Sequence, residues 1–250
     1  MEPSFNPFSL AGKTVLVTGA SSGIGRATAV QCSRMGAKIV LTGRNAQRLQ
    51  ETMEMLDGDG HLCFSADLTS ENEIASMVCG LPALDGVVHC AGIGQRKPCK
   101  SITAEDISAV MNINFNAAVL LQGSLLTNRK INKSASIVFI SSRTADIPTV
   151  ANSIYSASKA AIKTYARCLA DELAPRGIRV NSICPAMVWT DFIISEGVTA
   201  EELEQEEKKY PLKRYGRPED IANLAIYLLS DAASWMTGSS LDITGGSVEI

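Results

Sequence analysis

Short apolar segments alternate with longer amphipathic segments along the whole chain. The short segments are mostly apolar and lack the polar alternation of a half-exposed strand, which predicts strands buried on both faces of a parallel sheet. The predicted strands are 13–18, 37–41, 61–65, 86–89, 136–140, 178–183 and 240–243. The segments between them have helical spacing, at 23–35, 46–56, 71–78, 104–113, 116–128, 153–173 and 219–229.

Strands that alternate with helices predict a single α/β domain over residues 1–250. Right-handed crossovers between parallel strands build a doubly wound, Rossmann-type sheet of about seven strands with helices on both faces. No low-complexity linker divides the chain. The segment 191–210 interrupts the alternation and is rich in glutamate. Two interpretations of it stay open: a solvated surface helix, or a lid over a substrate.

Composition and charge exclude several classes of protein. The 250 residues are 46% hydrophobic with a formal net charge of -3, which predicts no basic face for nucleic acid. No apolar run approaches the roughly 20 residues that span a bilayer, and residues 1–7 lack the pattern of a signal peptide. We therefore expect a cytoplasmic protein that binds neither nucleic acid nor membrane.

The cysteines and histidines predict no metal site. Seven cysteines are scattered without paired ligand spacing, which is typical of reduced, mostly buried thiols in a cytoplasmic protein. The two histidines, His61 and His89, have no ligand pattern around them.

Tyr155 and Lys159 stand four residues apart in the predicted helix 153–173, so both side chains lie on one face. An ammonium beside a phenol stabilises the phenolate and lowers the tyrosine pKa from its usual value of about 10. The pair alone is a common pattern, and an apolar ring beside a solvated lysine is the simpler interpretation. A glycine-rich turn near the N-terminus and a serine pair upstream of the tyrosine favour acid–base chemistry instead.

The glycine-rich turn joins the first predicted strand to the first helix. Its residues are Thr18, Gly19, Ala20, Ser21, Ser22, Gly23, Ile24 and Gly25. Glycine allows a tight turn and a close approach of backbone to a pyrophosphate, and the helix N-terminus adds unpaired N–H groups. The spacing Gly-x-x-x-Gly-x-Gly differs from the commoner Gly-x-Gly-x-x-Gly. Its place after the first strand of an alternating chain nevertheless predicts a dinucleotide site.

Arg44 predicts that this dinucleotide is NADP(H). It follows the second predicted strand, where an acidic residue would bind the ribose 2′-hydroxyl of NAD and a guanidinium binds a 2′-phosphate. The alternative is a surface arginine that caps the next helix. Asp67, after the third strand, is expected either to accept a hydrogen bond from the adenine amino group or to cap the following helix.

Together the motifs resemble the classical short-chain dehydrogenases/reductases, among them the 3-oxoacyl-carrier-protein reductase-like members. The resemblance covers about residues 10–246. It rests on the order and spacing of the glycine-rich turn, Cys90-Ala91-Gly92, Asn114, Ser142, Tyr155 with Lys159, and Pro185 through Thr190. A Rossmann-type fold and hydride transfer with a nicotinamide cofactor are what this resemblance implies.

The resemblance also implies a role for each catalytic residue. Tyr155 is expected to be the general acid/base at the substrate oxygen, and Lys159 to lower its pKa and bind the nicotinamide ribose. Ser142, thirteen residues before Tyr155, is expected to hold the substrate oxygen. Asn114 is expected to hold a water in a proton relay to the lysine, with Asn112 as its rival in sequence.

Further cofactor contacts are implied on the same grounds. They are Leu68, Cys90, Ala91, Gly92, Pro185, Val188 and Thr190. Val188 is equally a candidate core residue. Two positions depart from the family pattern: Cys90 stands where asparagine is usual, and Ala186 where glycine is usual. We expect Cys90 to be a buried thiol beside the cofactor and not a nucleophile.

The predicted activity is the interconversion of a carbonyl and a secondary alcohol by an NADP(H)-dependent oxidoreductase. 3-Oxoacyl-carrier-protein reductase, acting on an acyl thioester, and sugar or polyol dehydrogenase both stay open as specific activities. A non-catalytic NADP-binding regulator is the alternative of another class, and the complete proton-transfer set disfavours it. By resemblance we also expect a homotetramer or homodimer that pairs the helices 116–128 and 153–173.

Overall fold

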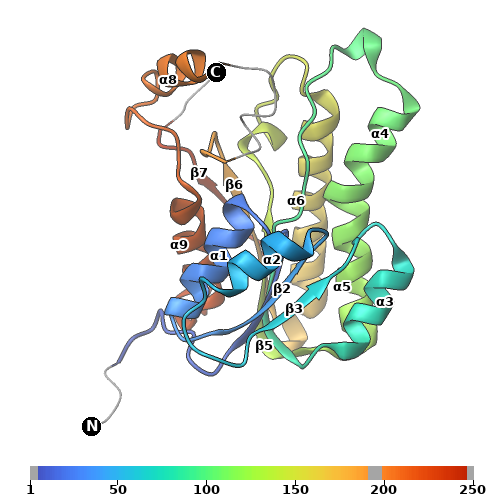
Figure 1. The fold of residues 1–250 in the computed structure, drawn as a ribbon, viewed down its shortest axis with the longest axis vertical. Helices are drawn as coiled ribbons and strands as arrows, with labels where there is room; N and C mark the ends of the chain where they lie inside the picture. Colours follow the sequence, from blue (N-terminus) through green and yellow to red (C-terminus); the bar gives the residue numbers. More distant parts are fainter. Residues whose placement is uncertain (1–4, 191–198, 247–250) are drawn as a thin grey trace.

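Seven strands form one parallel sheet in the order β3-β2-β1-β4-β5-β6-β7 (Figure 1). This computed structural model describes residues 5–190 and 199–246. The strands are β1 (Thr14–Thr18), β2 (Lys38–Gly43), β3 (Leu62–Ser65), β4 (Leu84–His89), β5 (Ile131–Ile140), β6 (Arg179–Pro185) and β7 (Ser240–Ile243). The order runs outward from β1 in both directions, which confirms the predicted single-domain, doubly wound α/β fold.

Helices cover both faces of the sheet. They are α1 (Gly23–Arg34), α2 (Ala46–Met53), α3 (Glu71–Gly80), α4 (Ala104–Met111), α5 (Ala117–Thr127), α6 (Ser153–Leu173), α8 (Ala200–Glu207) and α9 (Pro218–Leu229). In Figure 1, α1 and α9 lie on one side of the sheet, and α4, α5 and α6 lie on the other. The α8 helix stands apart from both layers, at the top of the view.

Alternate residues of a strand face two separate apolar cores. Along β1, Val15 and Val17 belong to the core that contains residues of α1 and α9, whereas Leu16 belongs to the core that contains residues of α5 and α6. All three side chains are fully buried. Because both faces are covered, the strands appear in the sequence as continuous apolar runs.

β5 begins at Ile131, whereas the apolar pattern predicted a start at residue 136. Ile131 pairs with Leu84, and the register between β4 and β5 shifts before Gly86 pairs with Ser136. Ser134, between these two pairings, has a left-handed φ of 60°. The first half of the strand is therefore irregular and polar, and hydrophobic periodicity does not reveal such a segment.

The predicted helices 104–113 and 116–128 form one helical stretch with a π-helical turn, Asn112–Asn116, between α4 and α5. By length and mean hydropathy alone, Ala104–Thr127 passes the test for a membrane-spanning helix. The core helix of a globular protein passes the same test, and Leu121 and Leu125 of α5 are fully buried in the core. A π turn often marks a functional position in a helix.

One histidine is enclosed in the core at the end of β4. The His89 ring stacks on Phe139 with 4.5 Å between ring centroids, and its Nε2 lies 3.1 Å from Gln122 Oε1. Burial lowers the pKa of His89 from 6.5 to about 4. The neutral ring, with its proton on Nε2, is therefore the form that the fold accommodates.

We expect His89 to make the fold sensitive to acid. Below pH 6.5 His89 is protonated in the unfolded chain, whereas in the folded chain it stays neutral down to about pH 4. The unfolded state therefore binds more protons, and the free energy of unfolding falls as the pH is lowered through this window. Between pH 7.5 and 5 the contribution of this residue is a loss of about 2 kcal/mol. Urea unfolding at both pH values measures it: the His89→Gln variant should lose less stability than the wild type by that amount. Equal losses in the two proteins would contradict the assignment.

Candidate active site

A cavity of about 1200 Å³ lies at the carboxyl ends of the strands. It lies between β1 and β4, where the strand order reverses: the strand after β1 is added on one side of the sheet and the strand after β4 on the other. Ligands bind at this point in open α/β sheets. The predicted residues that line it are Gly19, Ser21, Ser22, Gly23, Ile24, Gly25, Arg44, Asp67, Leu68, Cys90, Ala91, Gly92, Ser142, Tyr155, Lys159, Pro185, Val188 and Thr190. Asn114 is the predicted site residue that lies behind the cavity wall and not on it.

The glycine-rich turn packs too closely for larger residues. A Cβ on Gly25 would stand 2.3 Å from the carbonyl oxygen of Gly19, and Gly19 itself has a φ of +64°. Ser22 is the N-cap of α1 and makes no side-chain cap hydrogen bond. The first N–H groups of α1 therefore have no side-chain acceptor from Ser22, and the glycines beside them carry no side chain. Such a helix start suits a phosphate group.

Two residues that the sequence did not single out hold this turn in place. Thr18 Oγ1 accepts hydrogen bonds from the backbone N–H of Cys90 at 3.0 Å and of Ala91 at 3.1 Å, which joins the ends of β1 and β4. Arg26 Nη2 donates to the carbonyl oxygen of Ser21 at 2.7 Å, and its Nε donates to Thr52 Oγ1 at 3.0 Å. The turn is thereby tied both to the neighbouring strand and to α2.

The structure excludes helix capping as the role of Arg44. The N-cap of α2 is Asn45, whose Oδ1 accepts from the backbone N–H of Arg48 at 2.9 Å. Arg44 and Arg48 both line the cavity. This end of the cavity therefore carries two cations, of which the sequence interpretation noted only Arg44.

Asp67 does not cap a helix either. The N-cap of α3 is Ser70, whose side chain accepts from the backbone N–H of Glu73. Asp67 Oδ1 instead accepts from the backbone N–H of Thr69 at 2.9 Å and from its hydroxyl at 2.8 Å. These hydrogen bonds, with a smaller contribution from Arg44, hold the pKa of Asp67 below its ordinary value. A fixed carboxylate thus borders the cavity near Arg44.

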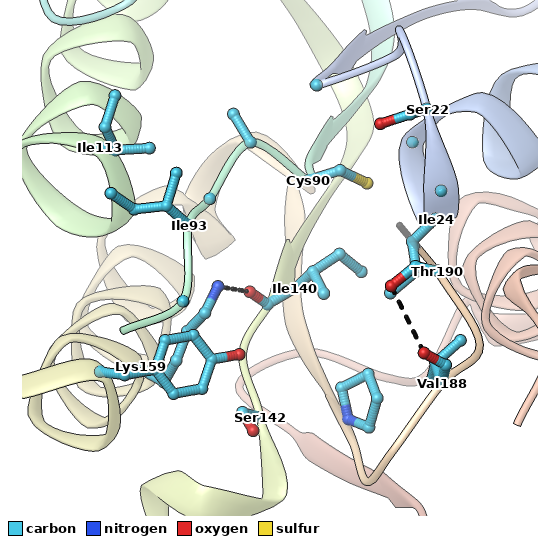
Figure 2. Close-up of a pocket in the computed structure, with 18 of the residues that line it drawn as sticks. Ser22, Ile24, Cys90, Ile93, Ile113, Ile140, Ser142, Lys159, Val188 and Thr190 are labelled. Carbon is cyan, nitrogen blue, oxygen red and sulfur yellow. Dashed lines mark hydrogen bonds between the residues drawn. The ribbon is translucent and has the colours of Figure 1, made fainter. Parts of the chain in front are cut away.

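Lys159 places a cation inside the protein. Its side chain is buried on α6, and Nζ donates to the carbonyl oxygen of Ile140 at 2.9 Å, as Figure 2 shows. The same nitrogen lies 5.7 Å from the centroid of the Tyr155 ring. Burial lowers the pKa of Lys159 from 10.5 to about 8, so the ammonium form still predominates at neutral pH.

The serine pair divides into a structural member and a member that lines the cavity. Ser141 Oγ donates to the carbonyl oxygen of Lys159 at 2.8 Å and thus fixes α6 to the end of β5. Ser142 Oγ accepts from the backbone N–H of Thr144 at 3.2 Å and from its hydroxyl at 3.0 Å. Because Ser142 Oγ is the acceptor in both hydrogen bonds, its own hydroxyl proton is available to the cavity that it lines.

Asn114 lies one layer behind Lys159. It is buried in the π turn, where its Oδ1 accepts from Ile93 N at 2.8 Å and its Nδ2 donates to Ser158 Oγ at 3.0 Å. Its rival Asn112 is exposed. A Cβ on Gly92 would stand 3.1 Å from Asn114 Oδ1 and 3.3 Å from Lys159 Nζ, so both polar atoms lie next to Gly92.

Cys90 is a protonated thiol in this structure. Burial raises its pKa to about 12, although nearby Lys159 acts in the opposite direction. It therefore has no thiolate character at neutral pH, as expected for a residue that is not a nucleophile.

Val188 belongs both to a core and to the cavity wall. It packs in the cluster with α9 and lines the cavity, and its carbonyl oxygen accepts a hydrogen bond from Thr190 Oγ1 at 3.4 Å (Figure 2).

The predicted lid, 191–210, is described only in part, because 191–198 lie outside the described residues. In the rest, Thr199 caps α8, and Glu201 and Glu204 are exposed as on a surface helix. The same helix nevertheless sends Leu203 into the cavity wall. Within the predicted segment 191–210, Leu203, Glu206 and Tyr210 line the cavity. Other wall residues that the sequence interpretation did not name singly are Ile93, Arg96, Ile147, Met187 and Tyr215.

Comparison with known proteins places the chain among enzymes of one family. Residues 19–247 match the family model described as enoyl-(acyl carrier protein) reductase. The chain is 32% identical over 237 residues to the 3-oxoacyl-[acyl-carrier-protein] reductase FabG of Rickettsia felis, over 95% of this chain and 97% of that one. It is 33% identical over 247 residues to the 7alpha-hydroxysteroid dehydrogenase of Escherichia coli, over 96% of each chain.

Solved structures show the same relationship. A crystal structure from Beutenbergia cavernae, described as a candidate NAD(P)-dependent gluconate 5-dehydrogenase with NADP bound at low occupancy, has a TM-score of 0.86 and 32% identity, over 96% of this chain and 98% of that one. A short-chain dehydrogenase/reductase from Brucella melitensis, described as glucose/ribitol dehydrogenase, has a TM-score of 0.90 and 30% identity, over 96% and 98%. The chain is therefore an oxidoreductase that belongs to the short-chain dehydrogenase/reductase family.

Proposed function

We propose that this protein is an NADP(H)-dependent oxidoreductase that interconverts a carbonyl and a secondary alcohol, with Tyr155 as the general acid/base. The observation that carries the proposal is the buried Lys159 ammonium beside the Tyr155 ring, in a cavity that extends to the glycine-rich turn. A buried cation next to a phenol at the carboxyl edge of the sheet is an arrangement for proton transfer.

The residues of the cavity fit a dinucleotide with a 2′-phosphate. Gly19 and Gly25 let the turn fold back tightly on itself, and both line the cavity, so a ligand can approach their backbone without meeting a side chain. Arg44 and Arg48 would hold the 2′-phosphate, and Asp67 would accept from the adenine amino group. NADP in the related Beutenbergia cavernae structure supports this choice of cofactor.

Each catalytic side chain has a distinct task in carbonyl reduction. When bound, the nicotinamide cofactor supplies the hydride that reaches the carbonyl carbon. The Ser142 hydroxyl donates a hydrogen bond to the carbonyl oxygen, and the Tyr155 phenol gives that oxygen its proton as negative charge develops there. The Lys159 ammonium stabilises the resulting phenolate by Coulomb attraction at short range in a buried site. Alcohol oxidation runs through the same groups in reverse.

Asn114 supports this set from behind. Its Nδ2 donates to Ser158 Oγ, which in turn donates to the carbonyl oxygen of Tyr155 at 2.7 Å. The turn of α6 that carries Tyr155 is therefore fixed to the π turn and to the loop at Ile93. We propose in addition that Asn114 holds a water in a proton relay to Lys159, since the polar atoms of both residues lie next to Gly92.

The relatives act on chemically different molecules, as their names state: a 3-oxoacyl thioester, a steroid and a sugar acid. Both 3-oxoacyl-carrier-protein reductase and sugar or polyol dehydrogenase therefore stay open as the specific activity. A cytoplasmic location is also proposed, because all seven cysteines are free thiols, as in a reducing compartment.

Replacing Tyr155 by phenylalanine tests the mechanism. We expect kcat for ketone reduction to fall by about a thousandfold, because the proton donor is lost. The dissociation constant for NADPH, measured by cofactor fluorescence, should stay within about twofold, since the phosphate and ribose contacts remain. Tyr165→Phe is the matched control: this residue lies on the same helix but packs against Phe115 and Phe139, so turnover should be unchanged. A fully active Tyr155→Phe enzyme would remove the proposed role.

Cofactor choice is tested at Arg44. The Arg44→Gln variant should bind NADPH about 10- to 100-fold more weakly, because a charge-assisted hydrogen bond to the 2′-phosphate is lost, while NADH binding should hardly change. Titration of both cofactors against the variant measures the ratio. Arg34→Gln, at an exposed arginine of α1 away from the cavity, is the control. A wild-type protein that prefers NADH would overturn the NADP(H) assignment.

We also propose a homotetramer or homodimer that pairs α5 and α6 between copies. An exposed stripe on α5 supports it, with Leu120 40% exposed and a Cβ on Gly123 meeting no atom within 4 Å. On α6 the small Ala157 is exposed. Gly123→Glu should therefore fold normally as a single chain yet shift the mass measured by light scattering from tetramer or dimer toward monomer. A wild type that is monomeric at micromolar concentration would exclude this pairing.

A further inference from the structure

A third apolar cluster, separate from the two cores of the sheet, forms one wall of the cavity. Leu203, Tyr210 and Tyr215 are its buried members, each less than 5% exposed at 4%, 4% and 2%. Met187 and Trp189 pack against them. Leu203, Tyr215 and Met187 line the same cavity as Ser142 and Tyr155. We refer to Leu203, Tyr210, Tyr215 and Met187 as the α8 wall.

One carboxylate fixes the α8 wall to the strand end that borders the cofactor residues. Glu207 Oε2 accepts from the indole N–H of Trp189 at 2.9 Å and from the backbone N–H of Tyr215 at 3.4 Å. The Trp189 and Tyr215 rings are 5.4 Å apart, and Trp189 N donates to the carbonyl oxygen of Gly216 at 2.9 Å. Glu207 is thus a positioning residue, the inward-turned member of a glutamate-rich helix.

Several charged and polar side chains that line the same cavity have partners within the protein. Arg143 Nη1 forms an ion pair with Asp242 at 2.7 Å. Glu206 pairs with Lys209. The Thr144 hydroxyl donates to Ser142 at 3.0 Å. Beside these engaged groups, Leu203 and Met187 give the cavity an apolar surface.

We infer that the substrate is a ketone with an apolar body, a hydrocarbon ring or acyl chain, that rests on the α8 wall while its carbonyl reaches Ser142 and Tyr155. Ile93 and Ile147 give the cavity further apolar surface among its lining residues. This inference rests on the proposed function and goes beyond it by selecting among its open substrate classes.

The physical reason is the balance of desolvation. A hydrocarbon body loses unfavourable contact with water when it covers Leu203 and Tyr215. A ketose placed there would bring several hydroxyl groups against a surface whose polar neighbours already have partners, and each hydroxyl left without a hydrogen bond opposes binding. The cavity should therefore discriminate strongly between two ketones of similar size and different polarity.

The test compares cyclohexyl methyl ketone with a ketopentose as substrates of the full-length protein with NADPH. We expect kcat/KM to favour the apolar ketone by at least about a hundredfold. In Leu203→Asn, which keeps the branched shape and the number of heavy atoms, kcat/KM for the apolar ketone should fall at least about tenfold, mainly through KM, with NADPH binding unchanged. Trp189→Phe, which keeps a ring but removes the N–H bonded to Glu207, should raise the same KM about threefold. Glu204→Gln, at an exposed position of α8, is the matched control with no change.

A binding measurement separates this inference from the proposed function. The melting temperature of the NADP-loaded protein is followed with 1-cyclohexylethanol and with xylitol, neither of which needs to react. Stabilisation by the apolar alcohol that is lost in Leu203→Asn supports the α8 wall even if no ketone is turned over, in which case the proposed function fails alone. Equal or better use of the ketopentose, stabilisation by xylitol instead, or a Leu203→Asn variant with unchanged preference and stabilisation would overturn the inference.

Discussion

The site is organised around an ammonium group that the fold keeps away from water. The shift in the pKa of Lys159 from 10.5 to about 8 corresponds to about 3 kcal/mol against the charged form. The carbonyl oxygen of Ile140, which accepts a hydrogen bond from Lys159 Nζ, compensates part of this cost. A cation buried in this way exerts its field through a medium that screens it weakly. The Tyr155 ring centroid lies 5.7 Å from this nitrogen, so in the proposed mechanism the burial that destabilises the ammonium also strengthens its effect on the phenol.

The fold supplies the constraint that brings these groups together. Ser142 follows β5, and Tyr155 and Lys159 lie in the first turns of α6. The adjacent Ser141 donates a hydrogen bond to the carbonyl oxygen of Lys159. Parallel strands place their carboxyl ends at one edge, so the turn after β1 and the loop after β4 reach the same place. Thr18 joins those two ends directly through its hydroxyl. The cofactor turn and the proton-transfer set thus belong to one rigid edge of the sheet.

Much of this arrangement could be predicted from local sequence patterns. Buried strands, the glycine-rich turn and the Tyr155–Lys159 spacing are each set by neighbouring residues, and they appear where the sequence predicted them. What the sequence did not reveal depends on contacts between distant segments. Arg26 acts through the Thr52 hydroxyl on another helix, and the polar start of β5 is held by pairing with Leu84. Such residues have no signature until the tertiary partner is known.

The same distinction separates the capping hypotheses from the cofactor hypotheses. Arg44 and Asp67 were each compatible with a helix cap, because sequence alone places helix ends only within a few residues. The structure gives both caps to the next suitable polar residues, Asn45 and Ser70. Arg44 and Asp67 therefore remain available to the cavity that they line, and their charges, one positive and one negative, suit the phosphate and the amino group of the proposed cofactor.

Substrate recognition is structurally independent of this edge. The α8 wall packs as a cluster of its own, whereas α6, which carries Lys159, packs in one of the two large cores of the sheet. Replacing a side chain such as Leu203 changes the surface offered to a substrate without moving the phenol or the ammonium, because the two regions share few packing contacts. A family can therefore keep one proton-transfer geometry while its members accept acyl thioesters, steroids or sugar acids. In this chain Trp189 connects the two regions. It stands between Val188 and Thr190, and its indole N–H donates a hydrogen bond to Glu207 at the end of α8, which fixes the position of the α8 wall relative to these two residues.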